Sequence, residues 1–450
     1  MTHGGKGVVV IGLGITGLSC AQHLSAKGVE FMVADTRFEP SLLPQLREQL
    51  PDVPVLLGPL DGEKLSTVEL LIMSPGISIE EPAIQQARMA GVAICSDIDL
   101  FCSEVSAPVI AITGSNAKST VTTLVGEMAC RAGVNVGVGG NIGTPVLDLL
   151  EQGPHQLYVL ELSSFQLEIT HRLQAEVAVI LNVSADHLDR HAGMADYLAA
   201  KQKIFSGCHQ VIENRDDPQT NYTNGGTFKK YSFGLSIPTE GEFGLIRNGE
   251  QEYLATAGQC LMPVCELKIK GRQNISNALA ALAIGNAVGL PMQVMLDVLR
   301  EFEGLPHRCQ WVASKEGVTF YNDSKGTNPG ATIAALEGLG QNLEGRVVLI
   351  AGGEGKGADF SGLADPVGTY CRAVILIGRD APAIGEVVAT QLDDPRAICK
   401  VGSMQQAVLE AFRHARSGDV VLLSPACASF DMFSGFEARG DAFIRAVGRL

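Results

Sequence analysis

The sequence lacks a surplus of basic residues. Its 450 residues include 34 lysines and arginines against 49 aspartates and glutamates, which gives a formal net charge of −15 at pH 7. A protein that binds nucleic acid or an anionic membrane over a broad surface normally has the opposite balance. We therefore expect no nucleic-acid partner and no membrane partner. Any polyphosphate ligand must be held by cations gathered locally.

Paired cysteines and long hydrophobic runs are also missing. The eleven cysteines are scattered, form no C-x-x-C pair and are odd in number, so they cannot all pair with one another. Reduced thiols of this kind are typical of the cytosol. No apolar run approaches the length of a membrane helix. These absences predict a cytoplasmic protein.

Length and composition favour several α/β domains. Single hydrophobic cores stop growing at roughly 250 to 300 residues, so a chain of this length is expected to form more than one. Hydrophobic residues make up 46% of the chain, and 51 residues are glycine. This composition is typical of a compact, turn-rich α/β protein and not of a disordered one.

Residues 7–35 have the pattern of a dinucleotide-binding unit. A strand leads into Gly12-x-Gly14-x-x-Gly17, a helix follows, and a second strand ends at Asp35. Glycines at this spacing permit a tight turn and the close approach of a diphosphate, and the acidic residue can bond a ribose hydroxyl. The pattern predicts a nucleotide diphosphate without distinguishing NAD, FAD or a UDP-sugar. A Rossmann-like unit without a ligand is the alternative.

A second phosphate-binding pattern lies at residues 108–126. A short apolar strand ends in the loop TGSNAKST, residues 113–120, and a helix continues from it. Such a loop can turn its N–H groups toward phosphate oxygens, with a lysine for the charge and a hydroxyl for a metal ion. We interpret it as an ATP site, although Ile112 and Ala117 stand where the usual pattern G-x-x-x-x-G-K-[ST] has glycines. An ordinary strand-to-helix turn is the alternative.

Two later segments offer ligands for a metal ion. Glu161 ends an apolar run that predicts a buried strand. A carboxylate at a strand end near a phosphate loop is well placed to hold Mg²⁺. His187 lies in a polar loop after the next strand, but a single histidine is more often a surface residue than a ligand. Lys201 falls on a predicted helix, where lysines are usually solvated.

The rest of the central region is less informative. Residues 210–270 contain short strand-like segments without clear helices, which predicts a peripheral antiparallel section with little chemistry. A helix begins near residue 271, and Asn274 and Asn277 share one of its faces. They could cap this helix, or they could contact a base or a ribose. Buried strands that end in polar loops then alternate with helices and predict another mostly parallel sheet.

We therefore predict an α/β protein of three domains. A Rossmann-like domain occupies residues 1–105, with its third strand at residues 69–73. A central domain of the P-loop type with a mostly parallel sheet occupies residues 106–308, and a Rossmann-like C-terminal domain occupies residues 309–450. Two nucleotide sites with magnesium-type ligands indicate phosphoryl chemistry on a nucleotide-linked substrate. These features do not distinguish a kinase from a ligase, and a dinucleotide-dependent oxidoreductase would leave the second and third domains unexplained.

Seven motifs in order along the whole chain are more specific. They are TGSNxKST (113–120), ELSSFQLE (161–168), DHLDR (186–190), GRxNxxN (271–277), PHR (306–308), NDSKxTN (322–328) and SPACAS (424–429). With these motifs the chain resembles the Mur ligase family. The resemblance implies an ATP-dependent amide ligase of peptidoglycan precursor synthesis, in which D-glutamate is joined to UDP-MurNAc-L-Ala through an acyl phosphate and a tetrahedral intermediate. A sister ligase for another amino acid, or a UDP-sugar-binding protein with impaired ATP use, is the alternative.

The resemblance also implies roles for individual residues. The catalytic residues would be Lys118, Glu161, His187 and Lys201. Two Mg²⁺ ions would be held by Ser119, Glu161, His187 and Lys201, the last as a carbamate. ATP would contact Gly114, Ser115, Asn116, Ala117, Lys118, Ser119, Thr120, Asn274, Asn277, Arg308 and Asp323. The UDP-sugar would contact Ile15, Thr16, Asp35, Thr36, Arg37, Gly76 and Asn141. D-Glutamate would contact Lys325, Thr327, Lys356, Ser429, Phe430 and Phe436.

Two further expectations follow from the resemblance. Because the substrates would span three domains of a monomer, domain closure is the expected way to assemble the site. The family's phosphate loop ordinarily has glycine at the position of Ala117. A Cβ there would crowd a phosphate or, if the residue needs a positive φ, add strain of about 1–2 kcal/mol. We therefore expect Ala117 to weaken the use of ATP.

Overall fold

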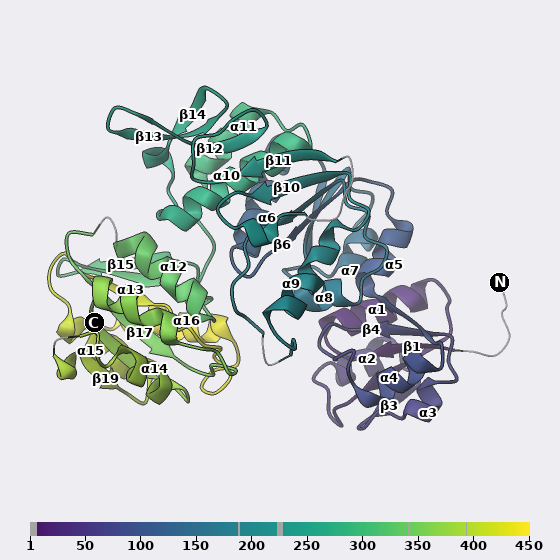
Figure 1. The fold of residues 1–450 in the computed structure, drawn as a ribbon. Helices are drawn as coiled ribbons and strands as arrows, with labels where there is room; N and C mark the ends of the chain where they lie inside the picture. The colour runs from purple at the N-terminus through teal and green to yellow at the C-terminus, as the bar shows by residue number, and fades with distance from the viewer. Residues whose placement is uncertain (1–6, 188–189, 223–227, 341–342, 393) are drawn as a thin grey trace.

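The computed structural model describes residues 7–187, 190–222, 228–340, 343–392 and 394–450. Within these residues the chain forms three β-sheets, one after another, in three α/β units arranged in an arc (Figure 1). The predicted fold class is confirmed. The divisions predicted after residues 105 and 308 lie between successive sheets, and as domain boundaries they stay predictions.

The first sheet is parallel throughout, in the order β3-β2-β1-β4-β5. Its strands are β1 (Val8–Ile11), β2 (Phe31–Asp35), β3 (Val55–Leu57), β4 (Leu70–Met73) and β5 (Ala93–Ser96). The helices of this unit are α1 (Ile15–Ala26), α2 (Leu43–Gln49), α3 (Gly62–Leu65), α4 (Pro82–Met89) and α5 (Asp97–Glu104). The order is that of a Rossmann-type sheet, with β1 in the middle. The strand predicted as the third is the fourth, because the edge strand β3 is too short to show a period in the sequence.

Two glycines shape the turn between β1 and α1. Gly12 has a φ of +93°, a conformation that strains residues with a side chain. A Cβ on Gly17 would lie 1.8 Å from the carbonyl oxygen of Gly12. Glycine is therefore required for α1 to begin so close to the strand end, and the predicted tight turn is confirmed.

The central sheet has the order β14-β13-β12-β11-β10-β9-β6-β8-β7. Its strands are β6 (Val109–Thr113), β7 (Val136–Gly140), β8 (Leu157–Glu161), β9 (Val177–Ile180), β10 (Gln210–Asn214), β11 (Lys229–Phe233), β12 (Glu242–Asn248), β13 (Gln251–Thr256) and β14 (Gln259–Pro263). Its helices are α6 (Lys118–Arg131), α7 (Val146–Glu151), α8 (Ser164–Glu168), α9 (Met194–Gln202), α10 (Arg272–Ala287) and α11 (Met292–Glu301). The strands from β7 to β12 pair in parallel, so the sheet is mostly parallel as predicted.

The antiparallel section predicted over residues 210–270 is wrong for its first part. β10 pairs in parallel with β9 and with β11, and only β12, β13 and β14 pair antiparallel. The chain between β10 and β11 is long enough for the crossover that parallel strands require. This section also lies close to the phosphate loop. Asn214 and Phe233, which end β10 and β11, line a cavity that also reaches the phosphate loop.

The third sheet has the order β15-β16-β20-β17-β18-β19, and of these strands only β15 is antiparallel to its neighbour. The strands are β15 (Gln310–Lys315), β16 (Val318–Asn322), β17 (Val347–Gly352), β18 (Cys371–Ile377), β19 (Ile398–Lys400) and β20 (Val420–Leu423). The helices are α12 (Pro329–Gly340), α13 (Ala364–Tyr370), α14 (Ala381–Val388), α15 (Met404–His414) and α16 (Phe436–Gly448). The second mostly parallel sheet is thereby confirmed.

Short 3₁₀ helices complete the described secondary structure. They lie at Lys203–Phe205, Pro218–Thr220, Val264–Glu266, Ser361–Leu363 and Pro395–Ala397. In the part of the chain that the structure describes, no helix combines the length and the apolar character needed to cross a membrane.

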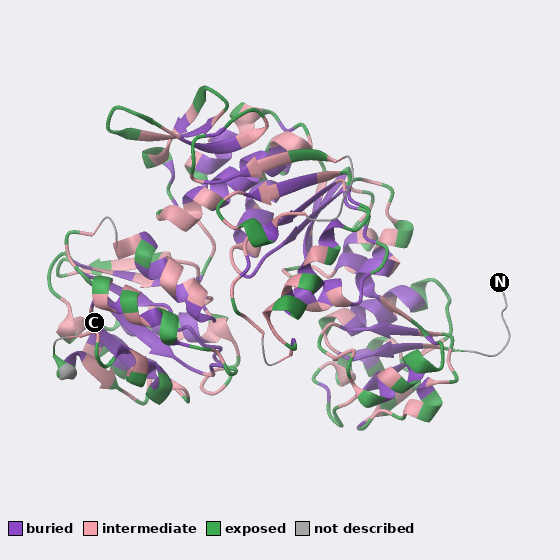
Figure 2. Cartoon of the chain, viewed as in Figure 1, coloured by how far each residue is buried: buried purple, intermediate pink, exposed green. Residues whose placement is uncertain are grey.

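The first and central units share one hydrophobic core. Leu24 of α1 and Phe101 of α5 belong to the same buried cluster as Tyr158 and Leu160 of β8. The rings of Phe101 and Tyr158 meet edge to face, with 5.0 Å between their centroids. The third unit instead has separate clusters on the two faces of its own sheet, and Figure 2 shows its buried strands enclosed by its own helices. Among the described residues, these two clusters contain none from the central unit, so the border of the third unit lacks the shared apolar core that joins the first two.

Asp99 connects the first unit to the central one. One carboxylate oxygen accepts a hydrogen bond from the Ser96 amide at 3.1 Å and completes the capping box of α5. The other accepts from the backbone N–H groups of His171 and Arg172 at 2.8 and 2.7 Å. One buried side chain therefore satisfies donors on both sides of the interface.

Replacing Asp99 by alanine should lower the apparent melting temperature by roughly 4 to 8 °C. The change removes a helix cap worth about 1 kcal/mol and leaves two buried N–H groups without an acceptor. Thermal unfolding followed by circular dichroism measures the effect. Asp99→Asn keeps an acceptor oxygen and should recover at least half of the loss. An equal loss in both variants would contradict the assigned role of these hydrogen bonds.

Candidate functional site

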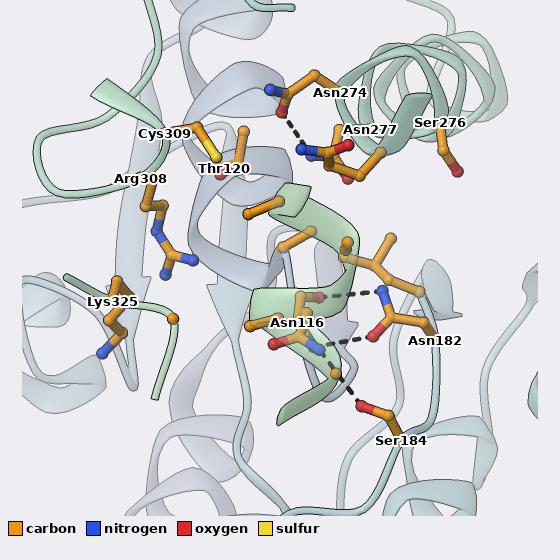
Figure 3. A pocket seen from close by; sticks show the side chains of 18 of the residues that line it. Asn116, Thr120, Asn182, Ser184, Asn274, Ser276, Asn277, Arg308, Cys309 and Lys325 are labelled. Carbon is orange, nitrogen blue, oxygen red and sulfur yellow. Dashed lines mark hydrogen bonds between the residues drawn. The ribbon is translucent and has the colours of Figure 1, made fainter. Parts of the chain in front are cut away.

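Two adjoining cavities lie where the central unit meets the third. The first has a volume of 320 Å³ and the second 280 Å³, and their walls share Asn116, Ala117, Arg308 and Lys325. In Figure 3, Arg308 and Lys325 lie on the side of the first cavity opposite Asn182. The phosphate loop thus forms a wall of both cavities.

The loop between β6 and α6 has the geometry of an anion site. α6 begins at Lys118, and none of the described side chains caps its first turn. Its leading N–H groups are therefore available to a negatively charged ligand. Ala117 precedes the helix with a φ of +66°, in the left-handed region. The possibility that this position needs a positive φ is confirmed, and an alanine occupies it.

Two lysines fold back onto the loop. Lys118 Nζ donates to the carbonyl oxygens of Gly114 at 2.8 Å and Ser115 at 3.0 Å. Lys201 Nζ also donates to the Gly114 carbonyl at 2.8 Å and to Thr113 Oγ1 at 3.4 Å, and only 1% of this lysine is exposed. Burial lowers the pKa of both amines, and the charge of Lys118 lowers the pKa of Lys201 further. The expectation of a solvated Lys201 on its helix is wrong, because α9 directs it at the loop.

Two more cations line the cavities at the border of the third unit. Arg308 Nη2 donates to Ser119 Oγ at 2.6 Å. Lys325 Nζ lies 3.9 Å from the centroid of the Phe436 ring. Burial lowers the pKa of Lys325 to about 8, and the charge of Arg308 contributes. Positive charge is therefore concentrated in a partly buried space, and a polyphosphate would relieve the repulsion.

The Glu161 carboxylate offers an oxygen to a cation. Its Oε1 accepts from Asn141 Nδ2 at 2.8 Å. Its Oε2 is buried and has no hydrogen-bond partner among the described residues, an arrangement that is unfavourable unless another ligand compensates it. Within the described ranges no three His, Cys, Asp or Glu side chains are grouped to hold a metal ion. A Mg²⁺ ion here would need hydroxyl, water or phosphate oxygens as well, which is the coordination it commonly has.

The loop that follows β9 joins this site to the first unit. The His187 ring packs against Phe165, with 4.8 Å between centroids, and the Arg190 guanidinium lies 4.3 Å from the same ring's centroid. Arg190 also donates to the carbonyl oxygens of Pro75 and Ile77, both at 2.7 Å. These two residues flank a predicted sugar contact. His187 and the first unit's loop are therefore held by one cluster.

The opposite end of the first cavity is lined by amides. Asn277 Nδ2 donates to Asn274 Oδ1 at 3.0 Å, and Asn274 Nδ2 donates to the Lys270 carbonyl at 2.8 Å. The N-cap of α10 is Gly271, so neither asparagine caps the helix. Both face the cavity (Figure 3). Of the two alternatives left open by the sequence, contact with a base or ribose is the one that this geometry permits.

Asp323 lies near these amides and is buried. Its two oxygens accept from the Cys309 amide at 3.1 Å and from Ser424 Oγ at 2.7 Å. Burial raises its pKa to about 6, although these hydrogen bonds oppose the increase. The carboxylate is thus held rigidly at the wall of the first cavity.

The structure brings many of the predicted site residues together. The first cavity is lined by Asn116, Ala117, Thr120, Asn274, Asn277, Arg308, Asp323 and Lys325. The second is lined by Ser115, Lys118, Asn141, Glu161, His187, Lys201, Lys325, Thr327, Lys356, Ser429, Phe430 and Phe436. Gly114 lies in the loop itself, and Ser119 lies in the first turn of α6. Residues 188 and 189 of the DHLDR motif are outside the described residues.

The predicted sugar contacts of the first unit are separate from both cavities. They gather at the carboxyl edge of the first sheet and are Ile15, Thr16, Asp35, Thr36, Arg37 and Gly76. A ligand that reaches both places would have to extend from this edge past the loop that contains Gly76. Their roles stay predictions.

The partners of Asp35 in the structure are protein groups, whereas the sequence predicts a ribose hydroxyl as its partner. Its Oδ2 accepts from the Leu13 amide at 2.6 Å and from Arg37 Nη2 at 2.7 Å, and its Oδ1 accepts from Arg37 N and Nε, both at 2.8 Å. Burial raises its pKa, but the Arg37 and Leu13 hydrogen bonds outweigh this and hold the pKa below its usual value. The side chain is fully buried, whereas Arg37 is exposed, so a ligand at this edge would meet Arg37 and not Asp35.

Sequence reasoning misses three residues that the structure places at the site. Asn182 hydrogen-bonds the phosphate loop, Asn214 lines the first cavity, and Phe165 packs edge to face against His187. No spacing signal could have found Asn182, because its partner Asn116 is 66 residues away along the chain.

Comparisons with known proteins agree with this architecture. Residues 6–96 match the family model of the Mur ligase MurD-like N-terminal domain, residues 112–285 that of the Mur ligase middle domain, and residues 307–427 that of the Mur ligase glutamate ligase domain. The UDP-N-acetylmuramoylalanine–D-glutamate ligase of Pseudomonas aeruginosa is 54% identical over 442 residues, which cover 98% of each chain. The chain belongs to the Mur ligase family.

Solved structures of Mur ligases share the fold. The UDP-N-acetylmuramate–alanine ligase of Thermotoga maritima aligns with a TM-score of 0.60 and 19% identity, over 99% of this chain and 100% of that one. MurF from Acinetobacter baumannii aligns with a TM-score of 0.61 and 16% identity, over 98% of this chain and 91% of that one. At such low identity these neighbours support the three-unit fold of this Mur ligase and nothing finer.

Replacing Ala117 of this Mur ligase by glycine should lower the KM for ATP by about 3- to 10-fold. Glycine adopts the observed positive φ without the strain of about 1 kcal/mol that a Cβ adds. Steady-state kinetics with varied ATP measure the change. Ala132→Gly, at the other end of α6 where φ is −76°, is the matched control and should give no improvement. Equal KM values for Ala117→Gly and the unmodified chain would contradict the strain argument.

Proposed function

We propose that this Mur ligase uses ATP to join D-glutamate to UDP-MurNAc-L-alanine in peptidoglycan precursor synthesis. The Pseudomonas aeruginosa relative, 54% identical over nearly the whole length, is named for the same D-glutamate ligation. The single observation that carries the proposal is the convergence of Lys118, Lys201, Arg308 and Lys325 on one cavity, beside a Glu161 oxygen that accepts no hydrogen bond from the described residues. Concentrated positive charge with an adjacent metal-type ligand suits the transfer of a phosphoryl group.

ATP would occupy the first cavity and extend its phosphates toward the second. Asn274 and Asn277 would face the base or ribose, and the N–H groups at the start of α6 would face the phosphates. Lys118 would exchange its two carbonyl partners for phosphate oxygens, which would also relieve the unfavourable burial of its charge. Arg308, which already bonds Ser119, would add positive charge from the side of the third unit.

Mg²⁺ would be held by Ser119, Glu161, His187 and Lys201, the last as a carbamate. When bound, the metal would neutralise charge on the phosphate oxygens. A neutral amine is the form that can react with carbon dioxide, and the burial that lowers the pKa of Lys201 favours that form. The number of metal ions, like the carbamate itself, stays a prediction.

The reaction would proceed in two substitutions. An oxygen of the alanyl carboxylate attacks the γ-phosphorus, the bond to the β-γ bridging oxygen breaks, and ADP leaves. The D-glutamate amine then attacks the carbonyl carbon of the acyl phosphate, and the tetrahedral intermediate expels phosphate as the amine loses its proton. The cations at the loop would stabilise the negative charge in both steps.

The third unit would orient D-glutamate. Lys325, Thr327, Lys356 and Ser429 offer donors to a dianionic amino acid, and Phe430 and Phe436 supply apolar walls. The Lys356 amine lies 5.8 Å from the centroid of the Phe430 ring. Because this unit provides one side of the second cavity, its closure would exclude water from the acyl phosphate. We also expect a monomer that acts in the cytoplasm.

Phosphate release should require ATP, Mg²⁺, UDP-MurNAc-L-Ala and D-glutamate together. L-Glutamate should give at most a few per cent of the rate, and Lys118→Ala should lower kcat by at least about 100-fold, because a phosphate-facing cation is lost. A coupled phosphate assay with mass spectrometry of the product makes the measurement. Release with another amino acid would indicate a sister ligase. Binding of UDP-sugar without any phosphate release would indicate a binding protein.

The KM for D-glutamate should rise by about 10-fold between pH 7 and pH 9. Lys325, whose pKa is lowered to about 8, is mostly protonated at pH 7 and mostly neutral at pH 9, so an anionic substrate loses its attraction as the pH rises. Lys325→Arg keeps its charge over this range and should flatten the profile. The same steep rise in both enzymes would show that another group controls D-glutamate binding.

A further inference from the structure

The polypeptide after β9 continues to follow the phosphate loop beyond the end of the sheet. The last paired residues of β6 and β9 are Thr113 and Ile180. The Leu181 amide then donates to the Thr113 carbonyl at 2.8 Å, and the Ser115 amide donates to the Asn182 carbonyl at 2.9 Å. A strand-like pairing therefore extends along the first part of the loop.

The side chain of Asn182 continues this pairing by another residue. The Asn116 amide donates to Asn182 Oδ1 at 2.8 Å, and Asn182 Nδ2 donates to the Asn116 carbonyl at 3.2 Å (Figure 3). The carboxamide thus satisfies the donor and the acceptor of one backbone residue, as a neighbouring peptide group would in a sheet. Side-chain contacts elsewhere in the loop, such as Asn116 Nδ2 to Ser184 Oγ at 3.3 Å, do not hold this backbone.

Asn116, which Asn182 holds in this way, directly precedes the strained residue Ala117. The peptide group that carries the Asn116 carbonyl ends at the nitrogen of Ala117, so its orientation helps to set the φ of Ala117. That φ is +66°, which an alanine adopts only when its surroundings impose it. A loop free of this restraint would relax toward conformations that direct fewer N–H groups at a phosphate.

We propose that Asn182 is a positioning residue that keeps the phosphate loop in its binding conformation and offsets the strain at Ala117. The proposal rests on the proposed function, since it takes the anion to be the phosphate of a nucleotide. Pre-organisation of this kind raises nucleotide affinity without touching the transferred group. Losing Asn182 should therefore raise the KM for ATP while kcat and the KM for the UDP-sugar stay within about 2-fold.

A double-mutant cycle with Asn182→Ala and Ala117→Gly tests the proposal. In the unmodified background, Asn182→Ala should weaken ADP binding by about 10-fold, because two hydrogen bonds to the loop are lost. In the Ala117→Gly background, where there is no strain to offset, the loss should be about 3-fold or less. Isothermal titration with ADP gives the four dissociation constants.

Asn214→Ala is the matched control. This asparagine lines the same cavity, but its Nδ2 donates to the Leu181 carbonyl at 2.7 Å and not to the loop. Its effect on ADP binding should be the same with Ala117 and with glycine at that position. If Asn182→Ala does not fold, Asn182→Ser, which keeps a shorter polar group, replaces it in the cycle. The loss of ADP affinity should again be smaller when residue 117 is glycine.

Hydrogen exchange of the backbone amides tests the proposal without a nucleotide. Asn182→Ala should accelerate exchange in the peptide covering residues 113–118 by about 10-fold or more, since the Asn116 amide loses its acceptor. Unchanged exchange, or the same loss of ADP affinity in both Ala117 backgrounds, would overturn the proposal. If Asn182→Ala exchanges faster but the unmodified enzyme binds no ADP, the positioning role is supported and the assignment of a nucleotide to this site is refuted.

Discussion

The concentration of buried positive charge at the phosphate loop is the constraint on which the rest of the site depends. Lys118 and Lys201 both donate to the Gly114 carbonyl, Arg308 bonds Ser119, and Lys325 stands across the cavity. Burial lowers the pKa of each of these groups, and a neighbouring positive charge lowers the pKa of the three lysines further. Such an arrangement is unfavourable in the absence of an anion and would become favourable with phosphates and a metal ion bound.

The units of the fold contribute to this site in different ways. The first unit shares a buried core with the central one, and Arg190 and Asp99 add hydrogen bonds across that border. The third unit reaches the phosphate loop through polar contacts, such as Asn328 Nδ2 to Asn116 Oδ1 at 3.3 Å. We infer that the shared core on one side and the polar border on the other let the third unit move while the first keeps its place. Closure over bound substrates would then exclude water.

Much of this organisation could be predicted from the sequence, because its signals are local. The glycines at 12 and 17 and the loop from 113 to 120 lie on strand–turn–helix segments with strong periodicity, and the structure has those segments where they were expected. Ala117 is identifiable because it stands where the family's phosphate loop ordinarily has glycine. Its positive φ could be stated only as a condition, since a backbone angle depends on the contacts around it.

The other features of the site could not be predicted, because they depend on contacts between distant parts of the chain. Lys201 is ordinary as a helical residue, and only the packing of α9 buries it against the loop. Asn182 belongs to the site because β9 lies beside β6, a pairing that the sequence of either strand does not specify. The parallel placement of β10 and β11 escaped prediction for the same reason, and Asn214 and Phe233 with it. Residues that act through a neighbour leave no motif of their own.

Transfer of an oxygen isotope tests the central claim most directly, namely that the cation cluster serves phosphoryl transfer to a carboxylate. UDP-MurNAc-L-alanine would be labelled with ¹⁸O in the alanyl carboxylate, and the released nucleotide and phosphate would be analysed by mass spectrometry. Activation as an acyl phosphate predicts one ¹⁸O atom in each inorganic phosphate and none in ADP. Phosphate without the label would contradict the account, and a label in AMP would show that the carboxylate is adenylated instead.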